Sequence, residues 1–202
     1  METWREAVWR AVPEDARPER FAPRRDFLLA NVERGERVLD LGAGDGTFAA
    51  ELVAAGCDVV AVDVAEEALR RARARVPGLD ARRVDEGAPL PLDEDAVDVV
   101  WAGEVLEHVA DVVGLLADVR RVLRWGGRLL VTTPYHGRVA LAVPAQREHA
   151  LEEHFDPRAD HLRFFTTHSL RALLADAGFA EIDVRPAGGP PLLRRSLQAI
   201  AR

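Results

Sequence analysis

The chain contains no lysine and almost no cysteine or side-chain amide. All 27 of its basic residues are arginines, and its amides are Asn31, Gln146 and Gln198. Either a GC-rich genome or selection for heat tolerance, which depletes thermolabile residues, accounts for this composition. Because Cys57 is the single cysteine, an intramolecular disulfide and a cysteine-based zinc cluster are excluded. We expect Cys57 to be a small buried residue at the start of a strand.

The sequence also lacks a long apolar run and an excess of positive charge. Its first residues are acidic and no apolar segment follows them, so neither a signal peptide nor a membrane span is predicted, and we expect a cytoplasmic protein. The formal net charge of −7 argues against a large nucleic-acid-binding surface, because such surfaces are usually basic. A length of 202 residues with 48% apolar content suits a single domain.

From residue 37 onwards, short apolar segments alternate with segments of helical periodicity. Strands are predicted at 37–41, 58–62, 81–84, 97–102, 128–133, 181–185 and 196–201, and helices at about 46–56, 65–75, 111–124 and 167–177. Such alternation predicts an α/β fold with a Rossmann-like, doubly wound parallel sheet. The last two strands are joined by a link too short for a parallel crossover. We therefore predict a seven-stranded sheet, mostly parallel, with an antiparallel C-terminal strand.

Residues 1–34 are helical in pattern but are interrupted by three prolines, which predicts short helices. Trp4, Val8 and Val12 form a stripe at helical spacing. This stripe belongs either to a packing helix or to a cap whose aromatic residues help to close a substrate pocket. We assign residues 1–34 as an N-terminal helical cap of a single domain that spans 1–202.

Residues 38–47 read Val-Leu-Asp-Leu-Gly-Ala-Gly-Asp-Gly-Thr, an apolar strand that runs into a glycine-rich turn. Glycines let the backbone bend sharply and let a ligand approach the peptide planes. Asp63 closes the next apolar run, where a carboxylate can accept hydrogen bonds from both hydroxyls of a ribose. The glycine spacing is not that of a dinucleotide site, and Asp40 and Asp45 would repel a pyrophosphate and suit a cationic ligand.

With these motifs and those that follow them, the chain resembles the class I S-adenosylmethionine-dependent methyltransferases, in particular the group that includes the ubiquinone-pathway O-methyltransferases. The resemblance runs from about Arg37 to the C-terminus. Besides the glycine turn and Val62-Asp63-Val64, it rests on Leu90-Pro91-Leu92, Val97–Val100, Glu104–Val109, Arg121–Gly127, Leu129–Pro134, His161–Thr166 and Ala177-Gly178-Phe179. It implies S-adenosylmethionine as cofactor and methyl transfer as activity.

The resemblance also implies which residues hold the cofactor at the carboxyl ends of the strands. The glycine turn is assigned to the methionine part, Asp63 to the ribose, and either Asp85 or Glu86 to the adenine amino group. Considered alone, Asp63 could equally be a helix N-cap. The predicted cofactor-binding residues are Asp40, Gly42, Ala43, Gly44, Asp63, Val64, Asp85, Glu86, Gly87, Ala102 and Gly103.

Glu104, Glu107 and His108 have the i, i+3, i+4 spacing that brings side chains to one face of a helical turn, next to the expected position of the cofactor's methyl group. Three interpretations stay open. Glu104 and His108 are catalytic, with His108 as the general base. Alternatively, the three side chains bind a divalent ion, Mg²⁺ or Mn²⁺. In the third interpretation, His108 is a structural residue.

The metal interpretation gains support from two resemblances. In some ubiquinone-pathway O-methyltransferases, an E-x-x-E-H turn is held to bind magnesium. Small-RNA 3′-terminal ribose 2′-O-methyltransferases combine this turn with a later Asp-His pair before a phenylalanine-rich stretch, and here Asp160-His161 precedes Phe164-Phe165. The implied ligands are Glu104, Glu107, His108 and His161.

Residues 135–160 form a long connection after the strand predicted at 128–133. Long connections at the mouth of a site are commonly lids or specificity elements. This connection contains Tyr135, His136, His149, His154 and Phe155. We expect its first three residues, Tyr135-His136-Gly137, to contact the substrate.

Together these features predict an enzyme that moves the methyl group of S-adenosylmethionine to a hydroxyl of a small molecule, with the protein supplying alignment and proton removal. The hydroxyl follows from the family analogy, and nitrogen and carbon acceptors stay open. Two alternatives remain. One is metal-dependent 2′-O-methylation of RNA 3′ ends, which the acidic charge disfavours. The other is a regulator that binds S-adenosylmethionine without turnover.

Overall fold

A computed structural model of the chain describes residues 4–137, 160–190 and 194–202 and the single positions 142, 149 and 156. Its seven-stranded sheet has the strand order β3-β2-β1-β4-β5-β7-β6. The strands are β1 (Arg37–Leu41), β2 (Asp58–Asp63), β3 (Asp80–Arg83), β4 (Val97–Gly103), β5 (Leu123–Pro134), β6 (Ile182–Ala187) and β7 (Ser196–Ala201). Strands β1 to β5 pair in parallel, whereas β7 is antiparallel to both β5 and β6. The predicted fold is confirmed.

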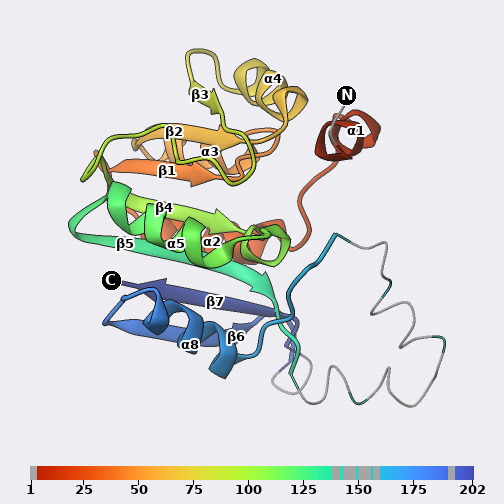
Figure 1. Cartoon of the computed structure of the whole chain (residues 1–202). Helices are drawn as coiled ribbons and strands as arrows, with labels where there is room; N and C mark the ends of the chain where they lie inside the picture. Colours follow the sequence, from red (N-terminus) through yellow and green to blue (C-terminus); the bar gives the residue numbers. More distant parts are fainter. Residues whose placement is uncertain (1–3, 138–141, 143–148, 150–155, 157–159, 191–193) are drawn as a thin grey trace.

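Helices pack on both faces of this sheet (Figure 1). The helices of the described residues are α1 (Trp4–Ala11), which lies beyond the strand ends, α2 (Phe21–Leu29), α3 (Thr47–Ala54), α4 (Glu66–Arg75), the 3₁₀ turn η1 (Leu106–His108), α5 (Val112–Val122) and α8 (Thr167–Asp176). Successive residues of a strand point to opposite faces, and on β4 Val100 packs with Leu116 of α5 while Trp101 packs with Phe48 of α3. The sheet therefore separates two apolar layers.

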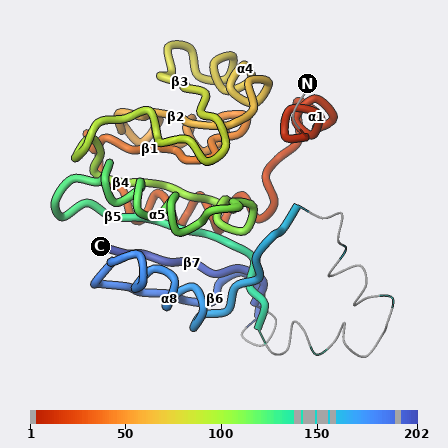
Figure 2. The backbone as a smooth tube through the Cα atoms, viewed as in Figure 1, coloured from red at the N-terminus to blue at the C-terminus, as the bar shows by residue number. Residues whose placement is uncertain are grey.

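The carboxyl ends of the parallel strands β1, β2, β4 and β5 all lie at the side of the sheet where α1 is found (Figure 1). The backbone trace in Figure 2 places the C-terminus at the opposite end of the sheet. Ligands of open α/β sheets bind beyond the carboxyl ends of the strands. The side of the sheet nearest α1 is therefore where a site is expected.

The link between α5 and β5 differs from the prediction. Asp111 caps α5 as expected, with its Oδ1 accepting a hydrogen bond from Gly114 N at 2.9 Å. We expected the helix to run to residue 124 and a strand to begin at 128. Instead, Leu123 already pairs with Val97 of β4, and the glycine pair that was expected to end the helix lies within β5. Burial of the Leu123 side chain against β4 stabilises the folded chain more than one further turn of α5 would.

The N-terminal segment forms two separate helices, as its prolines predicted, and they differ in how deeply they are buried. Helix α2 contributes Leu28, which is fully buried, to one apolar layer. Helix α1 has no buried residue and lies against α4, where Arg71 Nη1 donates to the carbonyl oxygen of Val12 at 2.8 Å. No helix in the described part of the chain is both long and apolar enough to cross a membrane.

Candidate functional site

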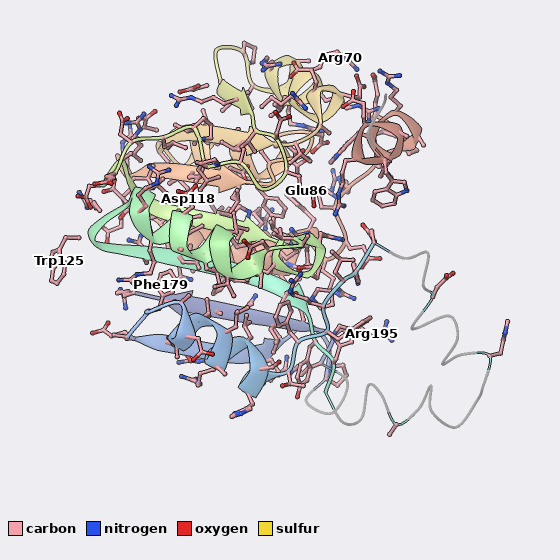
Figure 3. All side chains as sticks on the ribbon, viewed as in Figure 1. Arg70, Glu86, Asp118, Trp125, Phe179 and Arg195 are labelled. Atoms are coloured by element: carbon pink, nitrogen blue, oxygen red, sulfur yellow. The ribbon has the colours of Figure 1, made fainter. Side chains whose placement is uncertain are left out.

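A cleft of about 320 Å³ opens at the carboxyl ends of β1, β2 and β4, beneath α1. A second cavity of about 250 Å³ adjoins it, since Trp9, Val12, Gly42 and Glu104 line both. Of the residues predicted to bind the cofactor, the first cleft is lined by Gly42, Asp63, Val64, Asp85, Glu86 and Gly87. The second is lined by Gly42, Ala43, Gly44 and Gly103. Figure 3 shows Glu86 near these strand ends.

Asp40 and Ala102, which were also predicted to bind the cofactor, are buried beneath the cavities and are not among the residues that line them. The Asp40 side chain has one oxygen, Oδ2, with no hydrogen-bond partner among the described residues. Burial, together with the nearby charge of Asp63, raises the pKa of the Asp40 carboxyl to about 7. Asp40 therefore lies buried at the end of β1 and does not line either cavity.

The glycine turn is fixed to the end of β2 by backbone and side-chain hydrogen bonds. The amides of Gly42 and Ala43 both donate to the carbonyl oxygen of Val62, at 2.8 and 3.0 Å. Asp63 accepts one hydrogen bond on each carboxylate oxygen, from Gly44 N and from Ala65 N, both at 2.9 Å. Burial raises the pKa of Asp63, although these backbone donors act in the opposite direction. Each oxygen keeps a second lone pair for a ligand.

The E-x-x-E-H segment is not the regular helical turn that its spacing suggested. Glu104 adopts a left-handed conformation with a φ of 59°, and residues 106–108 form a 3₁₀ turn. A 3₁₀ turn aligns positions i and i+3, but Glu104 lies outside the turn in its left-handed conformation, so its side chain does not share a face with Glu107 as it would in an α-helix. Glu104 consequently lines both cavities, whereas Glu107 is buried behind it.

Glu107 is buried and has few hydrogen-bond partners. Its Oε2 accepts a hydrogen bond from Thr133 Oγ1 at 3.0 Å, and its Oε1 has no partner among the described residues. Burial and the neighbouring Glu104 raise the pKa of the Glu107 carboxyl to about 8. Near neutral pH this carboxyl therefore holds a proton, unless a cation binds beside it.

His108 is held by Asp160, which begins the second described stretch of the chain. The Nδ1 atom of His108 lies 3.0 Å from the carbonyl oxygen and 3.1 Å from Oδ2 of Asp160. Both are acceptors, so Nδ1 carries the proton and Nε2 carries the lone pair. Burial lowers the pKa of His108, an effect that Asp160 partly offsets. A neutral imidazole with a free Nε2 can accept a proton or bind a metal ion.

His161 packs edge-on against His108, with the ring centroids 4.8 Å apart. Ligand atoms of Glu107, His108 and His161 lie within 4.8 Å of one another. Three of the four predicted metal ligands are thus brought together, and the left-handed backbone at Glu104 keeps the fourth out of this group.

Helix α1 contributes residues that the sequence did not single out. Trp4 is 54% exposed and is not among the residues that line the cavities, whereas Trp9 lines both of them. A Cβ atom added to Gly44 would meet Cζ2 of Trp9 at 2.7 Å, so the indole packs directly against the glycine turn. Arg5 also lines the first cleft. Val8 and Val12 do face the cavities, but the spacing alone could not tell Trp9 from Trp4.

The start of the long connection does not reach either cavity. The amide of Tyr135 donates to the carbonyl oxygen of Arg195 at 3.0 Å, and the amide of His136 donates to that of Phe165 at 2.8 Å. Both residues therefore extend the chain of β5 beyond Pro134, with Arg195 and Phe165 as their partners. His154, Phe155 and most of the connection 135–160 lie outside the described residues, so its role as a lid stays a prediction.

Comparison with known proteins points in one direction. A family model described as a methyltransferase domain matches residues 14–184. A Mycobacterium tuberculosis protein named a probable S-adenosylmethionine-dependent methyltransferase is 34% identical over 152 residues, which cover 72% of this chain and 49% of that protein. A demethylmenaquinone methyltransferase of Clavibacter sepedonicus is 41% identical over 101 residues, covering 48% of this chain and 40% of that protein. The chain spans about half the length, or less, of these curated relatives.

Solved structures give the same fold. An S-adenosylmethionine-dependent methyltransferase from Aquifex aeolicus superposes with a TM-score of 0.71 at 18% identity, covering 97% of both chains. One from Mesorhizobium loti superposes with a TM-score of 0.70 at 24% identity, covering 94% of this chain and all of the other. At such identities the likeness establishes the fold alone.

Proposed function

Because the chain belongs to the class I S-adenosylmethionine-dependent methyltransferases, we propose that it transfers the methyl group of S-adenosylmethionine to a hydroxyl of a small molecule. The observation that carries the proposal is that Asp63, the glycine turn and His108 line adjoining cavities at the carboxyl ends of the strands. This arrangement brings three groups together: a carboxylate that can accept hydrogen bonds from ribose hydroxyls, a glycine backbone that a ligand can approach closely, and an imidazole that can accept a proton.

The cleft fits the cofactor that the family uses. Asp63 retains a lone pair on each oxygen for the ribose hydroxyls, and Asp85 and Glu86 are exposed at the rim for the adenine amino group. Val64 and Val105 contribute apolar surface to the lining of the cleft. When bound, S-adenosylmethionine supplies a methyl group on a sulfonium centre that is already activated.

His108 is the residue that we assign to proton removal. Its pKa is lowered by burial, so the imidazole is neutral near pH 7, as a base must be. Asp160 fixes the tautomer that leaves Nε2 available. A hydroxyl acceptor becomes nucleophilic as it loses its proton, which is why a base at this position favours oxygen over an amine that attacks through its own lone pair. Glu104, which lines both cavities, adds negative charge on the side where a sulfonium would lie.

A metal-assisted reaction is the second candidate, and the cluster of Glu107, His108 and His161 favours it. A divalent cation there would give Glu107 the counter-charge that it lacks. Imidazole nitrogens suit transition metals better than Mg²⁺, so Mn²⁺ is the first ion to test. A similar set of residues occurs in the small-RNA methyltransferases that the sequence resembles, and those enzymes act on RNA 3′ ends. The net charge of −7 disfavours RNA as the substrate here.

Methyl transfer from labelled S-adenosylmethionine to a panel of phenols, catechols, sugars and RNA 3′ ends tests the proposal. We expect turnover on a hydroxylated small molecule, reduced about 10²- to 10⁴-fold in His108→Ala. His168→Ala, an exposed histidine of α8, is the matched control and should leave the rate unchanged. Binding of the cofactor without transfer to any acceptor would instead support the regulator.

Chelation separates the base from the metal. A chelator should leave the rate intact if His108 is simply a base, and His161→Ala should then cost little. If the cluster binds a metal ion, the chelator should abolish turnover and added Mn²⁺ should restore it. Elemental analysis of each purified sample shows whether it contains a bound metal ion or is metal-free.

A further inference from the structure

The turn that carries His108 has little regular structure of its own. It is a single 3₁₀ turn of three residues, in which the amide of His108 donates to the carbonyl oxygen of Val105 at 3.0 Å. Leu106 is fully buried and anchors the start of the turn in an apolar layer. Because so short a 3₁₀ turn has weak hydrogen-bond geometry, the orientation of His108 depends on what holds the chain at the end of the turn.

The carbonyl oxygens at the end of this turn are bound by segments that are distant in the sequence. The carbonyl oxygen of Glu107 accepts hydrogen bonds from the amides of Leu162 and Arg163, at 2.8 and 3.2 Å. The carbonyl oxygen of His108 accepts one from Nη2 of Arg5 at 3.4 Å. The end of η1 is thus held from outside, by α1 and by the chain that follows the long connection.

The side chain of Arg163 extends this set of contacts to the next two residues. Its Nη1 donates to the carbonyl oxygen of Val109, and its Nη2 donates to that of Ala110 at 2.6 Å. Val109 and Ala110 follow η1 and precede Asp111, the N-cap of α5. A guanidinium presents its donors in a fixed planar fork, so two bonds to successive carbonyls fix the path of this link. One arginine therefore holds the backbone directly after His108.

The link that Arg163 holds belongs to the site, whereas Arg163 itself does not. His108 and Val109 both line the first cleft, but Arg163 is not among the residues that line either cavity. Asp160, three positions before Arg163, binds Nδ1 of His108. One short stretch of chain therefore holds both the imidazole and the backbone on which it is carried.

We infer that Arg163 is a positioning residue, which fixes the orientation of His108 for methyl transfer. The inference rests on the proposed function, and it applies whether His108 is a general base or a ligand of a metal ion. Displacement of a reacting or catalytic group by about 1 Å can cost about 100-fold in rate. None of the contacts of Arg163 involves a residue predicted to bind the cofactor, so its loss should affect kcat and leave cofactor binding intact.

A double-mutant cycle with His108→Ala tests the inference. Rates are measured with labelled S-adenosylmethionine and the phenol, catechol or sugar of the panel that gives the fastest turnover. Arg163→Gln should lower kcat about 10- to 100-fold and leave KM for S-adenosylmethionine within about threefold. In the His108→Ala background the same change should lower kcat by less than about twofold, because a positioning residue has no effect once the group that it positions is absent.

Arg171→Gln is the matched control. Arg171, an exposed residue of α8, donates from its guanidinium to the carbonyl oxygen of Ile182, so this change removes the same kind of bond away from the cavities. It should leave kcat unchanged in both backgrounds.

Amide hydrogen exchange measures the hold on the turn without any acceptor. In Arg163→Gln the amide of His108, which donates to Val105, should exchange about 10-fold faster than in the unaltered protein. In Arg171→Gln its exchange should not change. Unchanged exchange of this amide in Arg163→Gln would overturn the inference, because the turn would then be held without the arginine.

Each other outcome also decides. An equal loss of kcat in both backgrounds would overturn the inference and indicate a general structural role, and full kcat in Arg163→Gln would overturn it as well. Full activity of His108→Ala would end the role of His108 and the inference with it. If Arg163→Gln does not fold, Arg163→Lys, which keeps the charge but not the fork, replaces it in the cycle with the same expected pattern. If the unaltered protein transfers no methyl group, the proposed function fails, and hydrogen exchange still shows whether Arg163 holds the turn.

Discussion

The guanidinium of Arg5 lies 3.3 Å from the carboxylate of Asp160, and this carboxylate in turn lies 3.1 Å from Nδ1 of His108. Arg5 also donates to the carbonyl oxygen of His108 at 3.4 Å. Three segments that are far apart in the sequence thus meet at one imidazole. Movement of α1 away from the strand ends would therefore loosen the residues that orient His108.

Asp160→Asn should reduce kcat about 10-fold, because the group that orients a catalytic imidazole contributes through it. Asp160 raises the pKa of His108, so its neutralisation should lower that pKa and move the acid limb of the kcat/KM profile to lower pH. A pH–rate profile measures both effects. Asp176→Asn, on the exposed end of α8, is the control, and an acid limb that stays in place in Asp160→Asn would exclude this role.

Deleting residues 1–12 should abolish most turnover while the domain stays folded. Helix α1 has no buried residue, so its loss should lower Tm by only a few degrees, a change of about 1 kcal/mol in stability. Deleting residues 1–34 should be far more damaging, because Leu28 is fully buried and its removal costs about 2–5 kcal/mol. Circular dichroism and activity on the two truncated proteins check this. Complete unfolding of the shorter truncation would show that α1 is a packing helix.

Asp63→Ala should weaken binding of S-adenosylhomocysteine by about 1.5–3 kcal/mol, the contribution of hydrogen bonds to a charged acceptor. The variant should also be less stable, since the amides of Gly44 and Ala65 lose their acceptor. Calorimetry and thermal unfolding separate the two effects. Asp58→Ala, an exposed residue at the start of β2, should change neither by much. Undiminished affinity in folded Asp63→Ala protein would remove Asp63 from the site.

Glu107→Gln should stabilise the metal-free protein at pH 8 and much less at pH 5. The pKa of Glu107 is raised from its usual 4.5 to about 8 in the folded state, so above pH 4.5 the unfolded chain loses this proton first. Stability therefore falls as pH rises from 4.5 to 8, and the amide removes this penalty, which we expect to be about 2 kcal/mol or more. Urea unfolding at both pH values measures it. The exposed Glu94→Gln is the control, and equal gains at both pH values would contradict this explanation.

The fold was predictable because its signals are local. Alternating apolar segments and a glycine turn specify strands, crossovers and the position of Asp63 within one or two residues. The antiparallel last strand followed from a connection too short for a crossover. The prediction was wrong at Leu123. The local pattern there is helical, but pairing with β4 in the folded chain places the residue in a strand, and the local sequence does not reveal that contact.

The site was harder to predict because it depends on contacts between distant segments. Spacing predicted that Glu104 would share a face with Glu107, but the left-handed backbone at Glu104 is set by the end of β4 and the turn that follows. Arg163 stood in the sequence only as one residue of a motif, because its acceptors, the carbonyl oxygens of Val109 and Ala110, lie 54 and 53 positions away. Asp160 was named only as the neighbour of His161, and its hold on His108 requires the folded chain.

The contact between Trp9 and Gly44 also gives the protein an optical signal of its own. Of the four tryptophans, Trp4 and Trp125 face solvent and Trp101 is buried, and Figure 3 shows Trp125 at the end of the sheet remote from α1. Trp9 lines both cavities, whereas Trp101 lines only the second. A ligand that enters beside the glycine turn must change the surroundings of the Trp9 indole, so intrinsic fluorescence should report occupancy directly. Iodide would quench the fluorescence of the exposed tryptophans, so the remaining emission would come from the shielded ones.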